Sequence, residues 1–266
     1  MCRWTVHAGE PVFLEQLVLE PCHSLIAQSQ HAREAKAETN GDGFGLGWYG
    51  ERPEPGLYRE ILPAWSDANL RSLCQQLRAR LFFAHVRAST GTATARANCH
   101  PFAFGRWLFM HNGQIGGYER IRRRVEALIP DALYGARHGT TDSEALFLAI
   151  AGRGLEADPV GAVMAGLAEV EAIMAEAEIA EPLRFTAALS DGERVYGFRY
   201  SSDDKAPTLY VRDFPSGTVL ASEPLDIERG CWHAVPPNAL VSLAIGGRAE
   251  VAPLPVAARR PLSSVA

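Results

Sequence analysis

The second residue of the chain could supply both a nucleophile and a base. Cys2 follows Met1, and removal of that methionine would leave a cysteine with a free α-amine. The thiol has a reference pKa of about 8.5 and is a strong nucleophile once ionised. An α-amine of pKa about 7.7–8.0 could take its proton near neutral pH. Thiol and amine on one residue are therefore a candidate catalytic unit. A cysteine at position 2 is weak support alone, so other residues must complete the site.

The other cysteines predict neither a disulfide framework nor a metal site. The chain has five cysteines, an odd number, and no CxxC pair. Cys22, Cys99 and Cys231 each have a histidine within two residues, but the spacing is not that of zinc ligands. No basic and apolar leader opens the sequence. We therefore expect a reducing, cytoplasmic compartment, without disulfides and without a bound metal.

The elements that must position Cys2 start with strands. We expect strands at residues 3–6, 81–87 and 107–110, the first of them ended by the turn signal Gly9-Glu10-Pro11 and the last by His111-Asn112-Gly113. Glycine-rich residues 41–50 lack the flanking strand and helix of a dinucleotide loop, so they predict a hairpin turn and a closely packed strand.

Helices and further strands follow. A helix capped by Ser66 or Asp67 has apolar residues that extend to Leu81. A helix with Tyr118 to Leu128 on its apolar face comes later, and residues 141–144 form a capping box. The other predicted elements are helices at 145–151 and 159–179, and strands at 184–189, 195–200, 208–212, 218–221 and 240–245. This order predicts one α+β layered domain at residues 2–250 and a frayed tail at 251–266.

Composition excludes several classes of protein. Hydrophobic residues make up 47% of the 266 residues and charged residues 21%, which argues against disorder. The formal net charge is −5, so we expect no nucleic-acid partner. No apolar run is long enough to cross a membrane. The basic residues 120–124 are best interpreted as the solvated face of a helix.

Seven short motifs occur in order: MCRW at residues 1–4, HSLxxQS at 23–29, NGDGFGLGW at 40–48, HVRAST at 85–90, NCHPF at 98–102, HNG at 111–113 and TDSE at 141–144. The series resembles the class II glutamine amidotransferases, the N-terminal-nucleophile glutaminases. With SEPL at 222–225, the chain is similar to stand-alone members related to the γ-glutamyl hydrolases of ergothioneine synthesis and glutathione breakdown. The resemblance covers most of the chain and implies a four-layer αββα sandwich with mainly antiparallel sheets.

The resemblance implies substrate-binding roles for several residues. A γ-glutamyl substrate carries an α-carboxylate, which the guanidinium of Arg87 would bind, and an α-ammonium, which Asp142 would bind. The residues alone leave alternatives open, because Arg87 could form a surface salt bridge and Asp142 could simply favour a helix N-terminus. Thr90 and His100 match positions where the family places further substrate contacts.

Asn112 and Gly113 match the family's oxyanion pair. The Asn112 side-chain amide and the Gly113 N–H would point at the oxygen that becomes negative during acyl transfer. From the residues alone, an Asn-Gly hairpin turn is the stronger interpretation, because that turn is common. Ala88 replaces a frequent aromatic residue and Gly91 a frequent histidine of the family, so the shape of the pocket and the leaving group stay open.

These roles imply hydrolysis of a γ-glutamyl amide bond without a metal or organic cofactor. The Cys2 amine would take the thiol proton, and the thiolate would attack the γ-carbonyl. Water would then hydrolyse the γ-glutamyl thioester to glutamate. Two other functions stay open: an ammonia-donating glutaminase subunit for a separate synthetase chain, and a sensor that binds a γ-glutamyl compound without turnover. A homo-oligomer is also open. Since the motifs extend to residue 225, we expect a free-standing hydrolase or detached subunit rather than a two-domain transferase.

Overall fold

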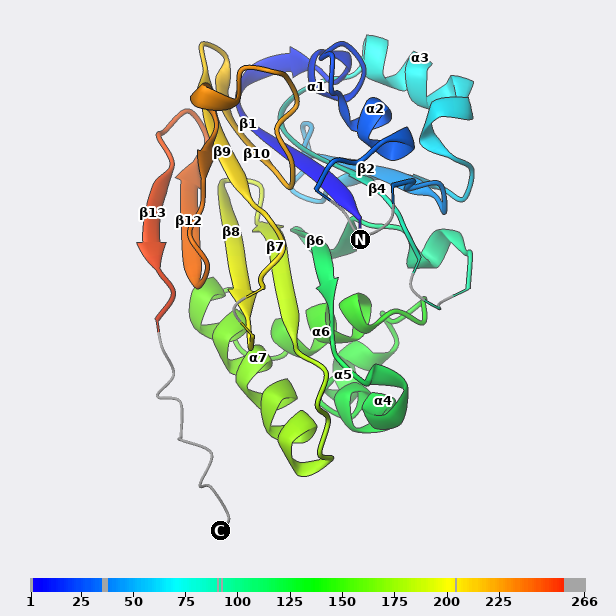
Figure 1. Cartoon of the computed structure of the whole chain (residues 1–266), viewed down its shortest axis with the longest axis vertical. Coiled ribbons are helices and arrows are strands. Elements are labelled where there is room, and N and C mark those ends of the chain that lie inside the picture. The colour runs from blue at the N-terminus through cyan, green and yellow to red at the C-terminus, as the bar shows by residue number, and fades with distance from the viewer. Residues whose placement is uncertain (1, 35–37, 90, 92, 204, 256–266) are drawn as a thin grey trace.

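Two antiparallel sheets lie face to face in the computed structural model, which describes residues 2–34, 38–89, 91, 93–203 and 205–255 (Figure 1). The seven-stranded sheet has the spatial order β11 (His233–Ala234), β9 (Tyr210–Phe214), β10 (Gly217–Ala221), β1 (Arg3–Phe13), β4 (Arg78–Val86), β2 (Phe44–Trp48) and β3 (Gly56–Glu60). The six-stranded sheet has the order β13 (Glu250–Pro253), β12 (Ala239–Ala244), β8 (Arg194–Ser201), β7 (Arg184–Ser190), β6 (Trp107–Gln114) and β5 (Phe102–Phe104). The N-terminal strand β1 is thus central in its sheet.

Helices cover the outer face of each sheet. The helices α1 (Glu15–Val18), α2 (Leu25–Gln30) and α3 (Ala68–Gln76) lie on the seven-stranded sheet. The other sheet carries α4 (Tyr118–Glu126), α5 (Asp131–Tyr134), α6 (Asp142–Ala151) and α7 (Pro159–Glu176) (Figure 1). One apolar cluster fills each of the three interfaces between layers. The predicted four-layer αββα sandwich is therefore confirmed.

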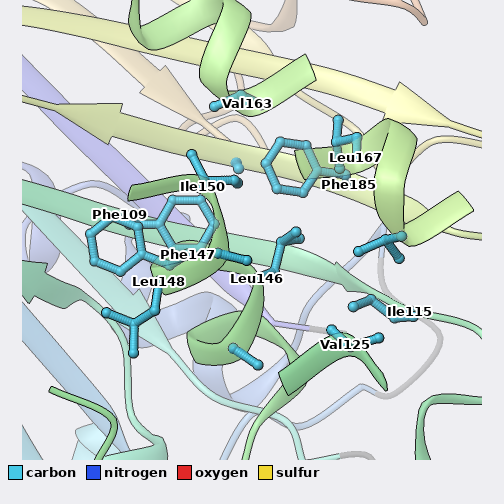
Figure 2. Packing of buried hydrophobic residues seen from close by; sticks show 14 of the residues in the cluster. Phe109, Ile115, Val125, Leu146, Phe147, Leu148, Ile150, Val163, Leu167 and Phe185 are labelled. Atoms are coloured by element: carbon cyan, nitrogen blue, oxygen red, sulfur yellow. The ribbon is translucent and has the colours of Figure 1, made fainter. Parts of the chain in front are cut away.

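The apolar cluster under α6 fixes that helix over β6 (Figure 2). The ring of Phe109 in β6 stacks on that of Phe147 in α6, with centroids 5.0 Å apart and planes inclined by 4°. A stacked pair adds about 0.5–1.5 kcal/mol to the stabilisation from burial alone. Helix α6 is buried on nearly all sides because α4 and α7 also contact it. This packing holds Asp142, the first residue of α6, close to the end of β6.

Two strands are longer than the sequence signals suggest. Strand β1 does not end at Gly9-Glu10-Pro11 but continues to Phe13. A shift in its register with β4, between Ala8 and Val12, accommodates these three residues. Such a bulge tolerates proline, which has no N–H to donate to a ladder. Strand β6 likewise runs through residues 111–113 to Gln114 and pairs with β7.

The helix of the first half is shorter than its leucine spacing suggests. Asp67, rather than Ser66, caps α3, with its Oδ1 accepting a hydrogen bond of 2.7 Å from the Leu70 N–H. The backbone of Leu77 is already extended, and Leu81 belongs to β4. Leu81 therefore continues the helical spacing of the leucines only by coincidence. Residues 251–253, which the sequence predicts to be part of a frayed tail, instead pair with β12 as part of β13, and residues 256–266 lie outside the described residues.

The glycine-rich residues 41–50 form the predicted closely packed strand. Strand β2 pairs with β3 as a hairpin and with β4 on its other side. A Cβ at Gly45 would lie 2.2 Å from the carbonyl oxygen of His100, and a Cβ at Gly47 would lie 2.7 Å from Pro101. These glycines therefore let the loop before β5 lie directly on β2.

Candidate active site

Cys2 and Arg87 lie beside each other just beyond the ends of β1 and β4, two neighbouring inner strands of the seven-stranded sheet. Arg3 of β1 pairs with Val86 of β4, so the residues just outside these two strands are neighbours. The Sγ of half-buried Cys2 lies 3.7 Å from the carbonyl oxygen of Ala88. Burial raises the pKa of the Cys2 thiol, while the positive charges of Arg87 and Arg3 oppose that rise. The thiol therefore needs a base to become a nucleophile near neutral pH.

Arg87 is held by backbone and hydroxyl oxygens. Its Nη1 donates to the carbonyl of Asp42 at 3.1 Å, and its Nη2 donates to Ser89 Oγ at 3.1 Å and to the carbonyl of Ala93 at 3.3 Å. Arg87 is only 3% exposed, so the surface salt bridge considered from the sequence is wrong. These contacts fix the plane of the guanidinium beside Cys2.

Asn112 faces the space between the sheets from the opposite side. Leu108 and Met110 of β6 belong to the apolar cluster between the sheets, and strand alternation puts Asn112 on their face. Asn112 is 1% exposed, and neither atom of its amide group forms a hydrogen bond with a described residue. Buried amides almost always have partners, so an unpartnered one indicates a function. The hairpin-turn interpretation is wrong, because Asn112 lies within strand β6 and pairs with Thr186 of β7.

Gly113 is required by the close approach of β7. A Cβ at this position would lie 1.9 Å from the carbonyl oxygen of Arg184 and 2.4 Å from His111 Nε2. The same carbonyl lies 3.1 Å from His111 Nε2, which must donate because a carbonyl only accepts. His111 Nδ1 is then an acceptor for the Ser143 hydroxyl at 2.8 Å. The imidazole thus ties β6 to α6.

Asp142 lies at the start of α6 and reaches β6. Thr141 caps the helix by accepting from the Glu144 N–H at 3.2 Å, which is half of the predicted capping box, while the Glu144 carboxylate accepts from the N–H groups of His138 and Gly139. The Asp142 carboxylate accepts from the Ser143 N–H at 2.8 Å and from the Ile115 N–H at 2.9 Å. Asp142 therefore also stabilises the N-terminus of α6, which is the alternative that the sequence leaves open. The second bond also places the carboxylate next to the end of the strand that carries Asn112.

Two histidines lie buried next to these groups. The rings of His85 and His100 have centroids 4.4 Å apart, and none of their four nitrogens bonds to a described residue. Burial lowers the pKa of His85 to about 3 and the pKa of His100 well below its ordinary value. Both rings are therefore neutral near pH 7. His100 packs against His85 and Phe102, and Thr90 lies outside the described residues.

Sequence reasoning gave no role to His85, His111 or Glu223. Both histidines are part of motifs that drew attention only to their neighbours, and each interacts electrostatically with a predicted site residue, His85 with Arg87 and His111 with Asp142. Glu223 is fully buried beside Arg3. The sequence signal for Glu223 is the SEPL motif at 222–225. The residue that Glu223 contacts, His23, lies about two hundred positions away in the chain.

Other kinds of site find little support in the described part of the chain. No three His, Cys, Asp or Glu side chains there lie close enough together to hold a metal ion. None of its helices has the length and apolar character needed to cross a membrane. The five cysteines are free thiols, with Cys22 and Cys231 exposed and Cys74 and Cys99 buried. Arginines 120, 123 and 124 are exposed on α4, as predicted for a solvated face.

Known proteins with similar sequences and structures agree on one family. The family described as glutamine amidotransferases class-II matches residues 15–219. A probable glutamine amidotransferase of Saccharomyces cerevisiae, DUG3, is 34% identical over 91% of this chain and 82% of its own. The gamma-glutamyl-hercynylcysteine sulfoxide hydrolase of Mycolicibacterium smegmatis is 32% identical over 91% of this chain and 96% of its own. A solved glutamine aminotransferase class-II domain protein from Silicibacter pomeroyi has a TM-score of 0.76 and 37% identity, covering 96% of this chain and 100% of that one. With a matching family, fold and motif order, this chain belongs to the class II glutamine amidotransferases.

Proposed function

We propose that this enzyme hydrolyses a γ-glutamyl amide bond through a thioester on Cys2. The observation that carries the proposal is the arrangement at one end of the space between the sheets. There, the thiol of Cys2 lies beside buried Arg87, and the facing sheet carries the buried amide of Asn112, which has no hydrogen-bond partner among the described residues. The names of the relatives, which include glutamine amidotransferase and gamma-glutamyl-hercynylcysteine sulfoxide hydrolase, support the same chemistry.

The glutamyl half of the substrate is bound by opposite charges. The guanidinium of Arg87 holds the α-carboxylate, and the carboxylate of Asp142 holds the α-ammonium. Support comes from their fixed positions, since Arg87 is oriented by the carbonyl of Asp42 and Asp142 by the N–H of Ile115. Thr90 and His100 stay further candidates for substrate contacts.

The reaction has two steps on one thiol. The α-amine of Cys2, free once Met1 is removed, takes the thiol proton, and the thiolate adds to the γ-carbonyl. The Asn112 amide and the Gly113 N–H donate to the oxyanion. The protonated α-amine of Cys2 then gives its proton to the departing nitrogen. Water attacks the thioester, which releases glutamate and restores the thiol. No cofactor takes part in this scheme.

Removal of Met1 is required by this scheme. Burial raises the pKa of the Cys2 thiol, so little thiolate exists at neutral pH without a nearby base. While Met1 is attached, the nitrogen of Cys2 is a peptide nitrogen and cannot accept a proton. The enzyme is therefore inactive until the methionine is removed.

A substrate panel tests the proposal and identifies the leaving group. Purified protein without Met1 is incubated with glutamine, a γ-glutamyl dipeptide and a γ-glutamyl amine, and released glutamate is measured. Turnover of at least one compound by the protein alone is expected. Activity only after a synthetase chain is added would indicate an ammonia-donating subunit, and binding without any turnover would indicate a sensor. Either result would contradict the free-standing hydrolase.

A further inference from the structure

A buried carboxylate outside the predicted catalytic set supports the strand that carries the nucleophile. Glu223 follows β10, and its side chain and that of Arg3, the residue after Cys2, are both fully buried. Arg3 Nη1 lies 3.6 Å from Glu223 Oε2 and donates to the carbonyl of Ser222 at 3.3 Å. The Trp4 N–H also donates to Ser222 Oγ at 2.9 Å. The first residues of β1 are therefore anchored to residues 222 and 223.

The same carboxylate binds the chain that follows α2. Glu223 Oε1 lies 2.6 Å from His23 Nε2 and accepts from the Arg33 N–H at 3.0 Å, and Oε2 accepts from the Glu34 N–H at 3.1 Å. Although burial acts to raise it, these hydrogen bonds and the charge of Arg3 hold the pKa of Glu223 below its usual value. Glu223 is therefore an ionised group at neutral pH, hydrogen-bonded to His23 and to the N–H groups of residues 33 and 34 and paired with the charge of Arg3.

The chain that follows α2 also reaches Arg87. We call residues 31–34 and 38–42 the connecting segment, whose two parts are joined by the Ala32 N–H, which donates to the carbonyl of Glu38 at 2.9 Å. At its end, the Asp42 carbonyl accepts from Arg87 Nη1 at 3.1 Å, and Asp42 Oδ2 accepts from the Ser89 N–H at 2.7 Å. The segment thus links the support of Cys2, at Glu223, with the support of Arg87, at Asp42.

We propose that Glu223 is a positioning residue for the reaction: its carboxylate holds the strand of Cys2 and the connecting segment in one arrangement, and so fixes the thiol relative to Arg87. Glu223 lies away from the substrate, because its partner Arg3 alternates along β1 with Trp4, whose side chain faces the space between the sheets. The inference rests on the function proposed for Cys2 and Arg87. Since a misplacement of about 1 Å can cost roughly a hundredfold in rate, the loss of this tether should be visible in catalysis.

The variant Glu223→Gln removes the charge and keeps the size of the side chain. One of its two oxygens becomes an NH2 group, which cannot accept a hydrogen bond from a backbone N–H, and the side chain no longer balances the charge of Arg3. We expect kcat/KM to fall by about 10- to 100-fold, mainly through kcat, because the reacting atoms are displaced. We also expect faster hydrogen exchange at the Arg33 and Glu34 amides, measured by mass spectrometry or NMR.

Glu126→Gln is the matched control. It removes a carboxylate that bonds to Arg122 at 2.6 Å and lies 2.5 Å from Arg137, on α4 in the opposite outer layer. This variant should keep the wild-type kcat/KM and the wild-type exchange at Arg33 and Glu34. If both variants lose activity equally, the loss reports general destabilisation and the positioning role is wrong.

Glu223→Asp keeps the charge and separates positioning from folding. The shorter side chain still neutralises Arg3 but retracts from the N–H groups of the connecting segment, so intermediate values of kcat/KM and exchange are expected. If Glu223→Asp and Glu223→Gln each show the wild-type kcat/KM and the wild-type exchange rates, the proposal is overturned. A lower melting temperature with unchanged kcat/KM below melting would overturn it too, because the role would be structural only.

A measurement without substrate separates this inference from the proposed function. If the wild-type protein hydrolyses no γ-glutamyl compound, the proposed function fails, but the rate at which iodoacetamide alkylates Cys2 still reports the position of the thiol. Positioning by Glu223 predicts an altered alkylation rate at Cys2 in Glu223→Gln and an unaltered rate in Glu126→Gln. Equal alkylation rates in all three proteins would overturn the positioning role.

Discussion

Individual residues in the proposed site act at different stages, so kinetics can tell them apart. Asn112 would act only when the carbonyl oxygen becomes negative, whereas Asp142 would already hold the α-ammonium in the bound substrate. An interaction made only in the transition state changes kcat. An interaction made equally with the bound substrate and with the transition state changes KM. The structural basis for this distinction is the buried amide of Asn112, which bonds to no residue in the described part of the chain, and the oriented carboxylate of Asp142.

Asn112→Ala should lower kcat and leave KM nearly unchanged. Loss of one oxyanion donor typically costs about 2.7–4 kcal/mol, or roughly 10²- to 10³-fold in kcat. The substitution also removes a buried amide with no partner among the described residues, so the folded state should not lose stability through a broken hydrogen bond. Steady-state kinetics on the best γ-glutamyl substrate measure the effect. A variant with wild-type kcat would rule Asn112 out as the oxyanion donor.

Asp142→Asn should raise KM more than it lowers kcat. The amide keeps an oxygen that can accept from the Ile115 N–H, so the start of α6 stays near β6, but the negative charge for the α-ammonium is lost. A charge-assisted hydrogen bond of this kind contributes about 1.5–3 kcal/mol, which predicts a rise in KM of roughly 10- to 100-fold. The same kinetic assay decides, and an unchanged KM would contradict the assigned role.

The elements position these residues through close contacts that depend on glycine. Gly45 on β2 lets the carbonyl of His100 approach, and Gly113 on β6 lets the carbonyl of Arg184 approach. In both cases a Cβ would overlap a backbone oxygen, which has no freedom to rotate away. The loop before β5 and the β6–β7 pairing therefore both depend on the absence of a side chain.

Gly45→Ala should destabilise the fold, and Gly50→Ala should not. A Cβ at Gly45 would lie 2.2 Å from His100 O, whereas a Cβ at Gly50 would meet no atom within 4 Å. Overpacking of this kind costs about 1–3 kcal/mol in the free energy of unfolding. Thermal unfolding of both variants measures the difference. Equal melting temperatures for the two would mean that the loop at His100 does not rest on β2.

Local patterns predicted most elements but misplaced several of their ends. Helices α4, α6 and α7 have strong apolar faces or caps, so their positions followed from the sequence. The Asn112-Gly113 pair is typical of a turn, yet pairing with β7 kept it in a strand, and no local signal reveals a partner more than seventy residues away. Leu81 extended a helical pattern although it belongs to β4, because tertiary pairing overrides spacing. Motifs pointed to Cys2, Arg87 and Asp142 as candidates, but the links through His111 and Glu223 are non-local and needed the structure.

The molecule as a whole should lose stability in acid because histidines are buried as neutral rings. Burial lowers the pKa of His85 to about 3, against an ordinary value of 6.5 in the unfolded chain. Between these values the unfolded chain binds a proton that the folded chain does not. The free energy of unfolding therefore falls as the pH drops below about 6.5, by about 1.4 kcal/mol per pH unit for one such histidine.

His85→Phe should weaken this dependence on pH. The phenyl ring can still stack on His100 but takes up no proton when the chain unfolds. Melting temperatures from pH 8 to about pH 4 should fall less steeply for the variant than for the wild type, with the difference appearing only below about pH 6.5. Parallel curves over the whole range would show that His85 does not contribute to acid unfolding.

The αββα sandwich as a whole brings the first residue after Met1 to the edge of the space between its sheets, and the central claim is that Cys2 uses this place as an N-terminal nucleophile. The most direct test measures γ-glutamyl hydrolysis by wild type, Cys2→Ala and Cys231→Ala, with each N-terminus determined by mass spectrometry. Cys231 is an exposed thiol outside the site and serves as the control. The account predicts that Met1 is absent in active protein, that Cys2→Ala has no measurable turnover, and that Cys231→Ala matches the wild type. An active enzyme that retains Met1, or wild-type turnover by Cys2→Ala, would contradict it.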